Sequence, residues 1–260
     1  MRDMRVSIIT ASYNSEKTIR ATLDSVISQT YENIQHIVID GASTDQTTKI
    51  LSEYGNISDS MTWISETDKG IYEAFNKGVL LSDGNIIFFL NSDDVFYDNE
   101  VIEKIVDEFE ENCDLNFVLC SVLVLRPQTQ FVVRRQVSRY MTKMFMRAGI
   151  MPPHPGVFCR REVFQTVGTF SKKYKIAGDF DWLLRGLVIS KLNYKIANII
   201  SVKMSAGGVS NDGFRSYVII TAELFRSFVE NGMLVFCILL PFRFLFKIHE
   251  FAYPFFNRQR

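Results

Sequence analysis

The chain has 260 residues, of which 47% are hydrophobic and 22% are charged, a balance that suits a folded domain and excludes wholesale disorder. Lys plus Arg and Asp plus Glu both number 29, so the formal net charge is zero and no chain-wide basic surface for nucleic acid is indicated. The length fits one large α/β domain, or one domain with a C-terminal appendage.

The first ninety or so residues alternate between two patterns. Short apolar runs at residues 6–10, 36–40, 61–65 and 85–90 predict buried strands. Helical spacing of apolar residues predicts helices at 17–28, after residue 45 and at 71–81. This alternation predicts a parallel sheet with helices on its faces, and right-handed crossovers place the strand C-termini along one edge.

A polar cluster follows each of the four predicted strands. In chain order the clusters read ASYN, DGASTD, SETDKG and NSDD. Ligands of open α/β sheets bind outside the carboxyl ends of the strands. We therefore expect the four clusters to line one crevice that serves as the active site.

After residue 94 the pattern changes. Residues 101–109 predict an amphipathic helix, 117–125 and 131–135 a pair of strands, and 139–150 another helix. The segment MPPHPGVF predicts a Pro-rich turn into a short strand, and residues 176–189 begin polar and then predict a helix.

The C-terminus combines apolar and basic residues. MLVFCILLPF at 233–242 is apolar all round but shorter than the roughly 20 residues of a membrane-spanning helix. Basic residues then stand among aromatic ones, at Arg243, Lys247, Arg258 and Arg260. The mixture predicts a segment lying in a membrane interface, with packing on the domain or on a second copy in a homodimer as the alternative.

The N-terminus and the cysteines indicate the compartment. No apolar stretch with a small-residue cleavage site follows the first methionine, so no signal peptide is predicted. The four cysteines form no CxxC pair and are expected to be free thiols in a reducing cytosol.

Carboxylates stand out among the polar clusters of the first half of the chain. Asp40 ends a hydrophobic strand, where it could accept a hydrogen bond from a nucleobase or simply cap the turn. Asp93 and Asp94 directly follow the fourth strand. Hard cations such as Mg²⁺ or Mn²⁺ take such oxygen ligands, and the ion would neutralise the diphosphate of a nucleotide sugar as it leaves.

The second half of the chain contains another acidic pair. Asp179 and Asp181 stand near the start of a predicted helix, where one could be a general base and the other a helix cap. His154 in the Pro-rich turn is either a site residue or structural. Lys69 and Arg185 could pair with phosphate or with neighbouring acids.

Two long segments resemble the family 2 glycosyltransferases, inverting enzymes with the GT-A fold. They are VSIITASYNSEKTIRATLDSVISQTYENIQHIVIDGASTDQT and SETDKGIYEAFNKGVLLSDGNIIFFLNSDDVF. The second is similar to the subgroup that builds bacterial capsule, O-antigen or colanic acid. The resemblance covers about residues 4–210 and implies an α/β fold with a Rossmann-like, mostly parallel sheet flanked by helices. It implies a GT-A domain at 1–212, with a nucleotide-binding half at 1–98 and an acceptor half at 99–212. A helical, membrane-associating segment would follow at 213–260.

The resemblance also implies roles for individual residues. Tyr13 would stack on the base near the Ala11 backbone, Asp40 would bond the base, and Asp68 would sit at the ribose and diphosphate beside Lys69. Asp93 corresponds to the last Asp of the DxD motif and would ligate the metal together with Asp94. Asp179 matches the catalytic base, with Asp181 as the alternative. The remaining expected contacts are Asn91 and Ser92 at the donor, and His154, Gly208 and Ser210 at the acceptor or over the closed site.

Three positions depart from the family pattern. Asn91 stands at the first DxD position, Gly41 at a frequent second acid, and Gly178 where a Glu usually precedes the base. The first departure suggests that Asn91 contacts the donor without binding metal strongly.

The expected activity is transfer of a sugar, with inversion, from a nucleotide-sugar donor to a saccharide acceptor. Family frequency favours a UDP-sugar, and the acceptor would be linked to polyprenyl diphosphate at the cytoplasmic face of the membrane. A non-catalytic nucleotide-sugar-binding or scaffold subunit is the alternative. A nicotinamide-dependent dehydrogenase needs a GxGxxG turn after the first strand, where ASYNSE stands instead. A nucleotidyltransferase would usually have a Gly-rich basic loop there.

Overall fold

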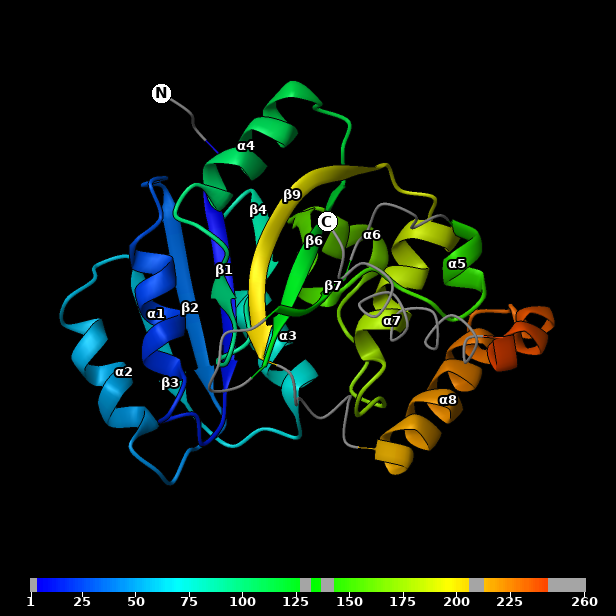
Figure 1. Ribbon diagram of the computed structural model, residues 1–260, viewed down its shortest axis with the longest axis horizontal. Helices are drawn as coiled ribbons and strands as arrows, with labels where there is room; N and C mark the ends of the chain where they lie inside the picture. Colours follow the sequence, from blue (N-terminus) through cyan, green and yellow to red (C-terminus); the bar gives the residue numbers. More distant parts are fainter. Residues whose placement is uncertain (1–3, 127–131, 137–142, 206–212, 243–260) are drawn as a thin grey trace.

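The computed structural model describes residues 4–126, 132–136, 143–205 and 213–242 (Figure 1). Its strands form one sheet in the order β3-β2-β1-β4-β8-β6-β9-β5, with β7 paired to β6. The first four strands are β1 (Val6–Ser12), β2 (Ile34–Asp40), β3 (Met61–Ser65) and β4 (Ile86–Phe89). They pair in parallel, which confirms the arrangement predicted for this half.

Helices cover both faces of the parallel strands because successive side chains of a strand point to opposite faces. Helices α1 (Ile19–Ile27) and α2 (Thr47–Gly55) share a buried cluster with Val38 of β2. Helix α3 (Ile71–Leu81) packs its Ala74 against Ile37 and Ile39, the neighbours of Val38 on that strand. The strand ends between these layers carry the polar clusters.

The second half extends the same sheet with mixed pairing. It comprises β5 (Val95–Phe96), α4 (Val101–Glu111), β6 (Phe117–Leu125), β7 (Val132–Gln136), α5 (Lys143–Arg147), β8 (Val157–Arg160), α6 (Val163–Val167), α7 (Gly178–Leu183) and β9 (Tyr194–Ser205). Strand β8 is antiparallel to both β4 and β6, whereas β9 is parallel to β6.

Several predicted elements of this half are confirmed, and others are new. The expected strand pair is β6 and β7, and the expected strand after the Pro-rich turn is β8. The helix predicted at 139–150 is shorter, as α5, with residues 139–142 outside the described part. The segment predicted at 176–189 is α7 followed by a π-helical stretch, Leu184–Ile189. Strands β5 and β9 and helix α6 were not predicted.

The C-terminal elements pack onto the second half. Helix α8 (Gly213–Glu230) leads to a 3₁₀ helix, Leu234–Phe242, at the lower right of Figure 1. Phe228 of α8 meets Phe180 of α7 edge to face, with ring centroids 5.7 Å apart. Leu224, Phe228 and Leu240 belong to the same buried cluster as α3 and α7. Within the described ranges, every helix is too short or too polar to cross a membrane.

Candidate active site

Asp40 ties the ends of three strands together. Its side chain is completely buried at the end of β2. One carboxylate oxygen accepts hydrogen bonds from the hydroxyls of Ser12 (2.9 Å) and Ser43 (2.5 Å). The other accepts from the backbone N–H of Ser43 (2.9 Å) and the hydroxyl of Ser65 (2.7 Å). Asp40 therefore organises the strand ends, and a base could reach it only if a serine hydroxyl turned away.

Tyr13 and Asp68 flank Gly41 at the mouth of this edge. The Tyr13 side chain is 64% exposed, which leaves its ring free to stack. A Cβ atom on Gly41 would lie 3.1 Å from Asp68 Oδ2 and 3.4 Å from Tyr13 Cδ2. A longer side chain there would crowd both residues, which is a physical reason for glycine at this departure from the family pattern. Asp68 also accepts the N–H of Gly70 at 2.9 Å.

Ala11 and Lys69 border the same edge. Ala11 is half-buried on β1, directly opposite Ile39 of β2. Lys69 is exposed, and its backbone N–H donates to Glu73 at 2.7 Å. Both residues belong to the polar clusters at the strand ends.

The NSDD turn carries one exposed and one buried aspartate. Asp93 is exposed, whereas Asp94 is 1% exposed and accepts a hydrogen bond from Asn91 Nδ2 at 2.9 Å. Burial, aided by the charge of Asp93, raises the pKa of Asp94 to about 8. The Ser92 hydroxyl lies 2.8 Å from that of Ser15, which joins this turn to the loop after β1.

These features decide how the turn could hold a metal ion. The exposed carboxylate of Asp93 can reach an ion, whereas the carboxylate of Asp94 is buried in the protein. No group of three or more His, Cys, Asp or Glu side chains stands ready to hold a metal in the part of the chain that the structure describes. The exposed oxygens fit a hard cation whose remaining ligands come from a diphosphate and water.

Asp179 has one tethered and one open carboxylate oxygen. It lies in the first turn of α7, half-buried. Its Oδ1 accepts the N–H of Phe180 at 2.8 Å and lies 3.3 Å from the hydroxyl of Tyr72. Among the described residues, Oδ2 has no hydrogen-bond partner. Burial raises the pKa of Asp179, and the nearby His154 opposes that shift. A positioned carboxylate with a free oxygen can take a proton.

His154 is held among aromatic rings close to Asp179. It begins a short 3₁₀ helix, His154–Gly156. Its imidazole stacks on Phe75 and Phe89, with ring centroids 5.6 and 5.7 Å apart. Burial lowers the pKa of His154, and the charge of Asp179 opposes the change. The structure thus brings these two predicted site residues together.

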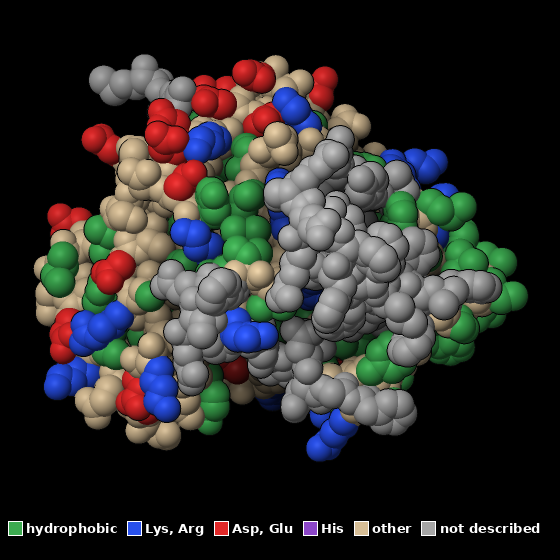
Figure 2. All heavy atoms as spheres, viewed as in Figure 1, with side chains coloured by type: hydrophobic (Ala, Val, Ile, Leu, Met, Phe, Trp, Pro, Cys, Tyr) green, Lys and Arg blue, Asp and Glu red, His purple; other side chains and the backbone are tan. Residues whose placement is uncertain are grey.

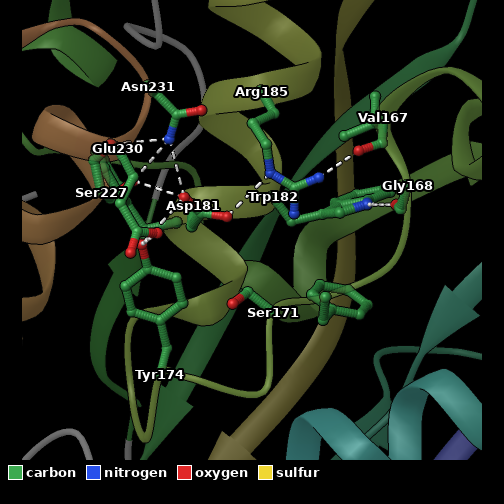
Figure 3. A network of polar contacts seen from close by, with 12 residues as sticks. Val167, Gly168, Ser171, Tyr174, Asp181, Trp182, Arg185, Ser227, Glu230 and Asn231 are labelled. Carbon is green, nitrogen blue, oxygen red and sulfur yellow. Dashed lines mark hydrogen bonds and ion pairs between the residues drawn. The ribbon is translucent and has the colours of Figure 1, made fainter.

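Asp181 faces Ser227 of α8 (Figure 3). It is 4% exposed and accepts hydrogen bonds from Ser227 (2.8 Å), Asn231 (3.0 Å) and Arg185 Nε (2.9 Å). The Tyr174 hydroxyl adds a longer contact at 3.4 Å. Asp181 therefore joins α7 to the C-terminal helix.

Arg185 is occupied by the same network. Besides Asp181, its guanidinium donates to the backbone carbonyl of Val167 (Figure 3) and to that of Thr169. The sequence left two roles open for Arg185, pairing with phosphate or with a neighbouring acid. The structure contains the pairing with a neighbouring acid, Asp181. Within the described part of the chain, both carboxylate oxygens of Asp181 accept hydrogen bonds, whereas only one of those of Asp179 does.

Residues 7–168 match the family model described as glycosyl transferase family 2. The chain belongs to this family. It is therefore an enzyme, a glycosyltransferase that transfers a sugar. Over 207 residues it is 26% identical to a PGL/p-HBAD biosynthesis glycosyltransferase of Mycobacterium bovis (strain BCG / Pasteur 1173P2), covering 79% of this chain and 78% of that protein.

Solved glycosyltransferases share the GT-A fold of this family 2 member. Residues 1–349 of S. aureus TarS, in complex with UDP-GlcNAc, match with a TM-score of 0.68 at 17% identity, covering 90% of this chain and 72% of that one. The mannosyltransferase PcManGT from Pyrobaculum calidifontis, in complex with GDP-Man and Mn²⁺, matches with a TM-score of 0.64 at 19% identity, covering 92% and 72%. The chain spans 40% of the longer TarS chain.

Two residues near the site of this glycosyltransferase were not predicted from the sequence. Two predicted residues cannot be placed. Gly208 and Ser210 lie outside the described residues. Tyr72 and Glu223 were not predicted, yet both contact the segment that leads to Asp179. Neither stands in a spacing pattern tied to Asp179, so the sequence held no local signal for them.

Proposed function

We propose that this family 2 enzyme is a metal-dependent inverting glycosyltransferase whose donor is a nucleotide sugar. Among nucleotide sugars, we propose a UDP-sugar. The half-tethered carboxylate of Asp179, whose Oδ2 has no hydrogen-bond partner among the described residues, is the observation that carries this proposal. The complexes of TarS with UDP-GlcNAc and of PcManGT with GDP-Man support a nucleotide-sugar donor. The acceptor that we propose is a saccharide on a polyprenyl diphosphate, used in cell-surface polysaccharide synthesis at the cytoplasmic face of the membrane.

The proposed reaction is a single in-line displacement. Asp179 Oδ2 takes the proton of an acceptor hydroxyl, and the hydroxyl oxygen bonds to the anomeric carbon of the donor sugar. The bond from that carbon to the diphosphate breaks, and the nucleoside diphosphate leaves with the electron pair. Attack from the face opposite the leaving group inverts the anomeric configuration. Asp179 must be ionised at the start, so the nearby His154 helps by opposing the effect of burial.

Donor binding is assigned to the strand ends. Tyr13 would stack on the base, Asp68 would face the ribose and diphosphate beside Lys69, and Asn91 and Ser92 would line the leaving group. Asp93 would hold a Mn²⁺ or Mg²⁺ ion, with Asp94 beneath it as support. The bound ion supplies positive charge that stabilises the departing diphosphate. The Mn²⁺ in the PcManGT complex supports this metal class.

A calorimetric titration of UDP and of GDP tests the donor site. Each nucleotide is titrated with Mn²⁺ and then with a chelator, into wild type, Asp93→Ala and the control Asp83→Ala. Asp83 pairs with Arg5 at the opposite end of β4, so its loss leaves the site intact. We expect Mn²⁺ to strengthen UDP binding by about tenfold or more, about 1.4 kcal/mol, and only Asp93→Ala to abolish that gain. Failure of both nucleotides to bind with metal present would refute the donor site.

Sugar transfer itself is measured with a defined panel. The assay follows release of UDP from UDP-glucose, UDP-galactose and UDP-GlcNAc, and of GDP from GDP-mannose, with a polyprenyl-diphosphate-linked saccharide as acceptor. Turnover of one UDP-sugar would support the proposed donor class. Turnover of GDP-mannose alone would replace it.

An apolar surface on the C-terminal elements supports a membrane contact. Val218, Phe225 and Val229 on α8 are 46–50% exposed, and Leu234, Val235 and Ile238 on the 3₁₀ helix are 60–74% exposed. Figure 2 shows hydrophobic side chains gathered at this end of the molecule. The basic and aromatic residues that follow in the sequence suit an anionic lipid surface. We therefore assign this surface to the membrane that holds the acceptor.

Vesicle sedimentation tests that assignment. We expect wild type to bind phosphatidylglycerol vesicles more strongly than phosphatidylcholine vesicles, and Val235→Ser with Ile238→Ser to weaken binding. Ile57→Ser is the matched control, because Ile57 is also 74% exposed but lies just after α2. Light scattering distinguishes the homodimer: a wild-type dimer that the double variant converts to monomers would replace the membrane assignment.

A further inference from the structure

A carboxylate on α8 holds the segment that leads to the proposed base. The backbone N–H groups of Lys175, Ile176 and Ala177 donate to Glu223 at 2.7, 3.0 and 2.8 Å. Glu223 is only 8% exposed. Successive backbone N–H groups that converge on a carboxylate form an anion-binding turn, so the negative charge of Glu223 fixes the path of this backbone. We name residues 175–179 the base-bearing turn.

Tyr72 of α3 holds the same turn at two further points. Its hydroxyl donates to the carbonyl oxygen of Ile176 and lies 3.3 Å from Asp179 Oδ1. The ring is buried and stacks on Phe170 with centroids 5.8 Å apart. Ile176 is thus bound through its N–H by Glu223 and through its carbonyl by Tyr72. Two helices far apart in the sequence therefore meet at one residue of the base-bearing turn.

Gly178 makes this approach possible. A Cβ atom on Gly178 would lie 2.7 Å from Cε2 and 2.8 Å from Cζ of Tyr72. These distances are too short for a side chain, and both contacts are to a buried aromatic ring. The family resemblance expects a Glu at this position, and here the Tyr72 ring fills the space. The departure at Gly178 and the presence of Tyr72 are therefore two sides of one packing arrangement.

We propose that Tyr72 and Glu223 are positioning residues that fix the base-bearing turn, so that Asp179 presents Oδ2 to the acceptor hydroxyl. This inference rests on the proposed role of Asp179 as the base. It makes α8 part of the catalytic unit, because Glu223 comes from that helix. Catalysis by a positioned base is sensitive to displacements of about 1 Å, so loss of either contact lowers kcat.

The charged groups around the turn determine a pH signature. Tyr72 and His154 face Asp179, and the charge of Glu223 acts on Tyr72. The Tyr72 hydroxyl shares its one proton between the Ile176 carbonyl and Asp179 Oδ1, and a hydrogen bond to the ionised carboxylate lowers the pKa of that carboxylate. Removing the Tyr72 hydroxyl is therefore expected to raise the pKa of Asp179 and move the acidic limb of the kcat/KM profile to higher pH. A purely structural role for Tyr72 would reduce the amount of active enzyme without moving that limb.

The experiment measures kcat, KM and the pH profile of Tyr72→Phe and Glu223→Gln in the sugar-transfer assay. Each variant has a matched control. Tyr54→Phe removes a similar Tyr–Asp hydrogen bond, from Tyr54 to Asp24 at 2.6 Å, far from the turn. Glu230→Gln removes a carboxylate from the same helix as Glu223. Expected results are a loss of kcat on the order of tenfold for Tyr72→Phe and Glu223→Gln, with donor KM unchanged, and wild-type values for both controls.

Asp179→Asn, assayed in parallel, separates the two levels of the argument. If Asp179→Asn retains wild-type turnover, the proposed base is wrong. If Asp179→Asn is inactive while Tyr72→Phe keeps the wild-type kcat and pH profile, the base stands and the positioning role is overturned. Should Glu223→Gln fail to fold, as judged by loss of nucleotide binding, the pH profile of Tyr72→Phe alone decides.

Discussion

Two regions of the molecule each contain two kinds of aspartate. The donor end comprises the ends of strands β1 to β4, where we propose that the donor binds. The acceptor end comprises the start of α7, where we propose that the acceptor binds. At the donor end, Asp40 is buried with four hydrogen bonds, whereas Asp93 is exposed. At the acceptor end, Asp181 is buried in a network with α8, whereas Asp179 keeps Oδ2 without a partner among the described residues. In each region one carboxylate holds backbone segments in place and another is available to a ligand.

This difference teaches how to separate structural acids from reactive ones. A buried carboxylate with all its donors in place is costly to disturb, because its partners then lose their hydrogen bonds. A carboxylate with an open oxygen contributes little to the fold and can contribute much to the reaction. Substitutions should therefore affect stability in one class and turnover in the other.

The largest effect is expected for Asp179→Asn. An amide cannot take the acceptor proton, so kcat should fall by about 10²–10⁴-fold. The free energy of unfolding and the affinity for UDP should stay near wild type. The assay is UDP release in the sugar-transfer panel, with calorimetry for binding. Equal losses of turnover and of UDP affinity would contradict the separation of the two classes.

Asp181→Asn should show the opposite behaviour. It leaves Arg185 without its ionic partner, and breaking a buried pair in this way costs about 3–5 kcal/mol. Urea unfolding measures the loss, and the turnover of the molecules that remain folded should stay near wild type. Asp83→Asn breaks an exposed pair with Arg5 and should cost less than about 1 kcal/mol. A cost for Asp181→Asn as small as this control would remove Asp181 from the structural class.

His36 on β2 gives the free energy of unfolding a pH dependence of its own. It lies buried on β2, its Nε2 is 3.0 Å from the Thr10 hydroxyl, and burial lowers its pKa from 6.5 to about 4. The unfolded chain takes up a proton as the pH falls below 6.5, whereas the folded chain keeps the imidazole neutral until about pH 4. From this group the free energy of unfolding should fall by about 3 kcal/mol between those pH values.

His36→Gln isolates that contribution. The difference between the wild-type and variant unfolding free energies, measured in urea from pH 7 to pH 4, should change by the same amount and level off above pH 6.5. Two parallel curves would show that His36 can be protonated without unfolding.

The smallest effect is expected for Asp40→Asn. The hydroxyls of Ser12, Ser43 and Ser65 can rotate toward other acceptors, so the cost should be about 1–3 kcal/mol. A double-mutant cycle with Ser65→Ala measures the pairwise part of this energy. Weaker UDP binding without a change in stability would instead favour direct contact between Asp40 and the base.

The sequence predicted the first half of the fold better than the second for a physical reason. Each strand and helix up to Leu90 carries its own apolar period and ends in a turn cluster. In contrast, β9 (YKIANIISVKMS) lacks a clean alternation, because its residues pack irregularly beside β6, whose pairing shifts register. Pairing with β5 and β6 stabilises this strand more than its own residue pattern does.

The identity of the acids was predictable, but their availability was not. Both aspartates near the start of α7 fit a general base by spacing. What separates them is contact with Ser227 and Asn231, which lie 46 and 50 residues from Asp181 in the chain. Tyr72 is 107 residues from Asp179. No local pattern encodes such pairs, so only the folded structure distinguishes them.

The junction between β4 and β8 has a consequence for motion. Here the two halves meet through strand pairing, with Ile86 opposite Arg160, Ile87 opposite Cys159 and Phe88 opposite Phe158. The rings of Phe88 and Phe158 stack across the junction, with centroids 4.0 Å apart and ring planes nearly parallel at 9°. Hinge closure needs a boundary that few contacts cross. We therefore expect the sheet to keep the NSDD turn and Asp179 at a fixed separation, and the loops at the strand ends to move instead when substrates enter and leave.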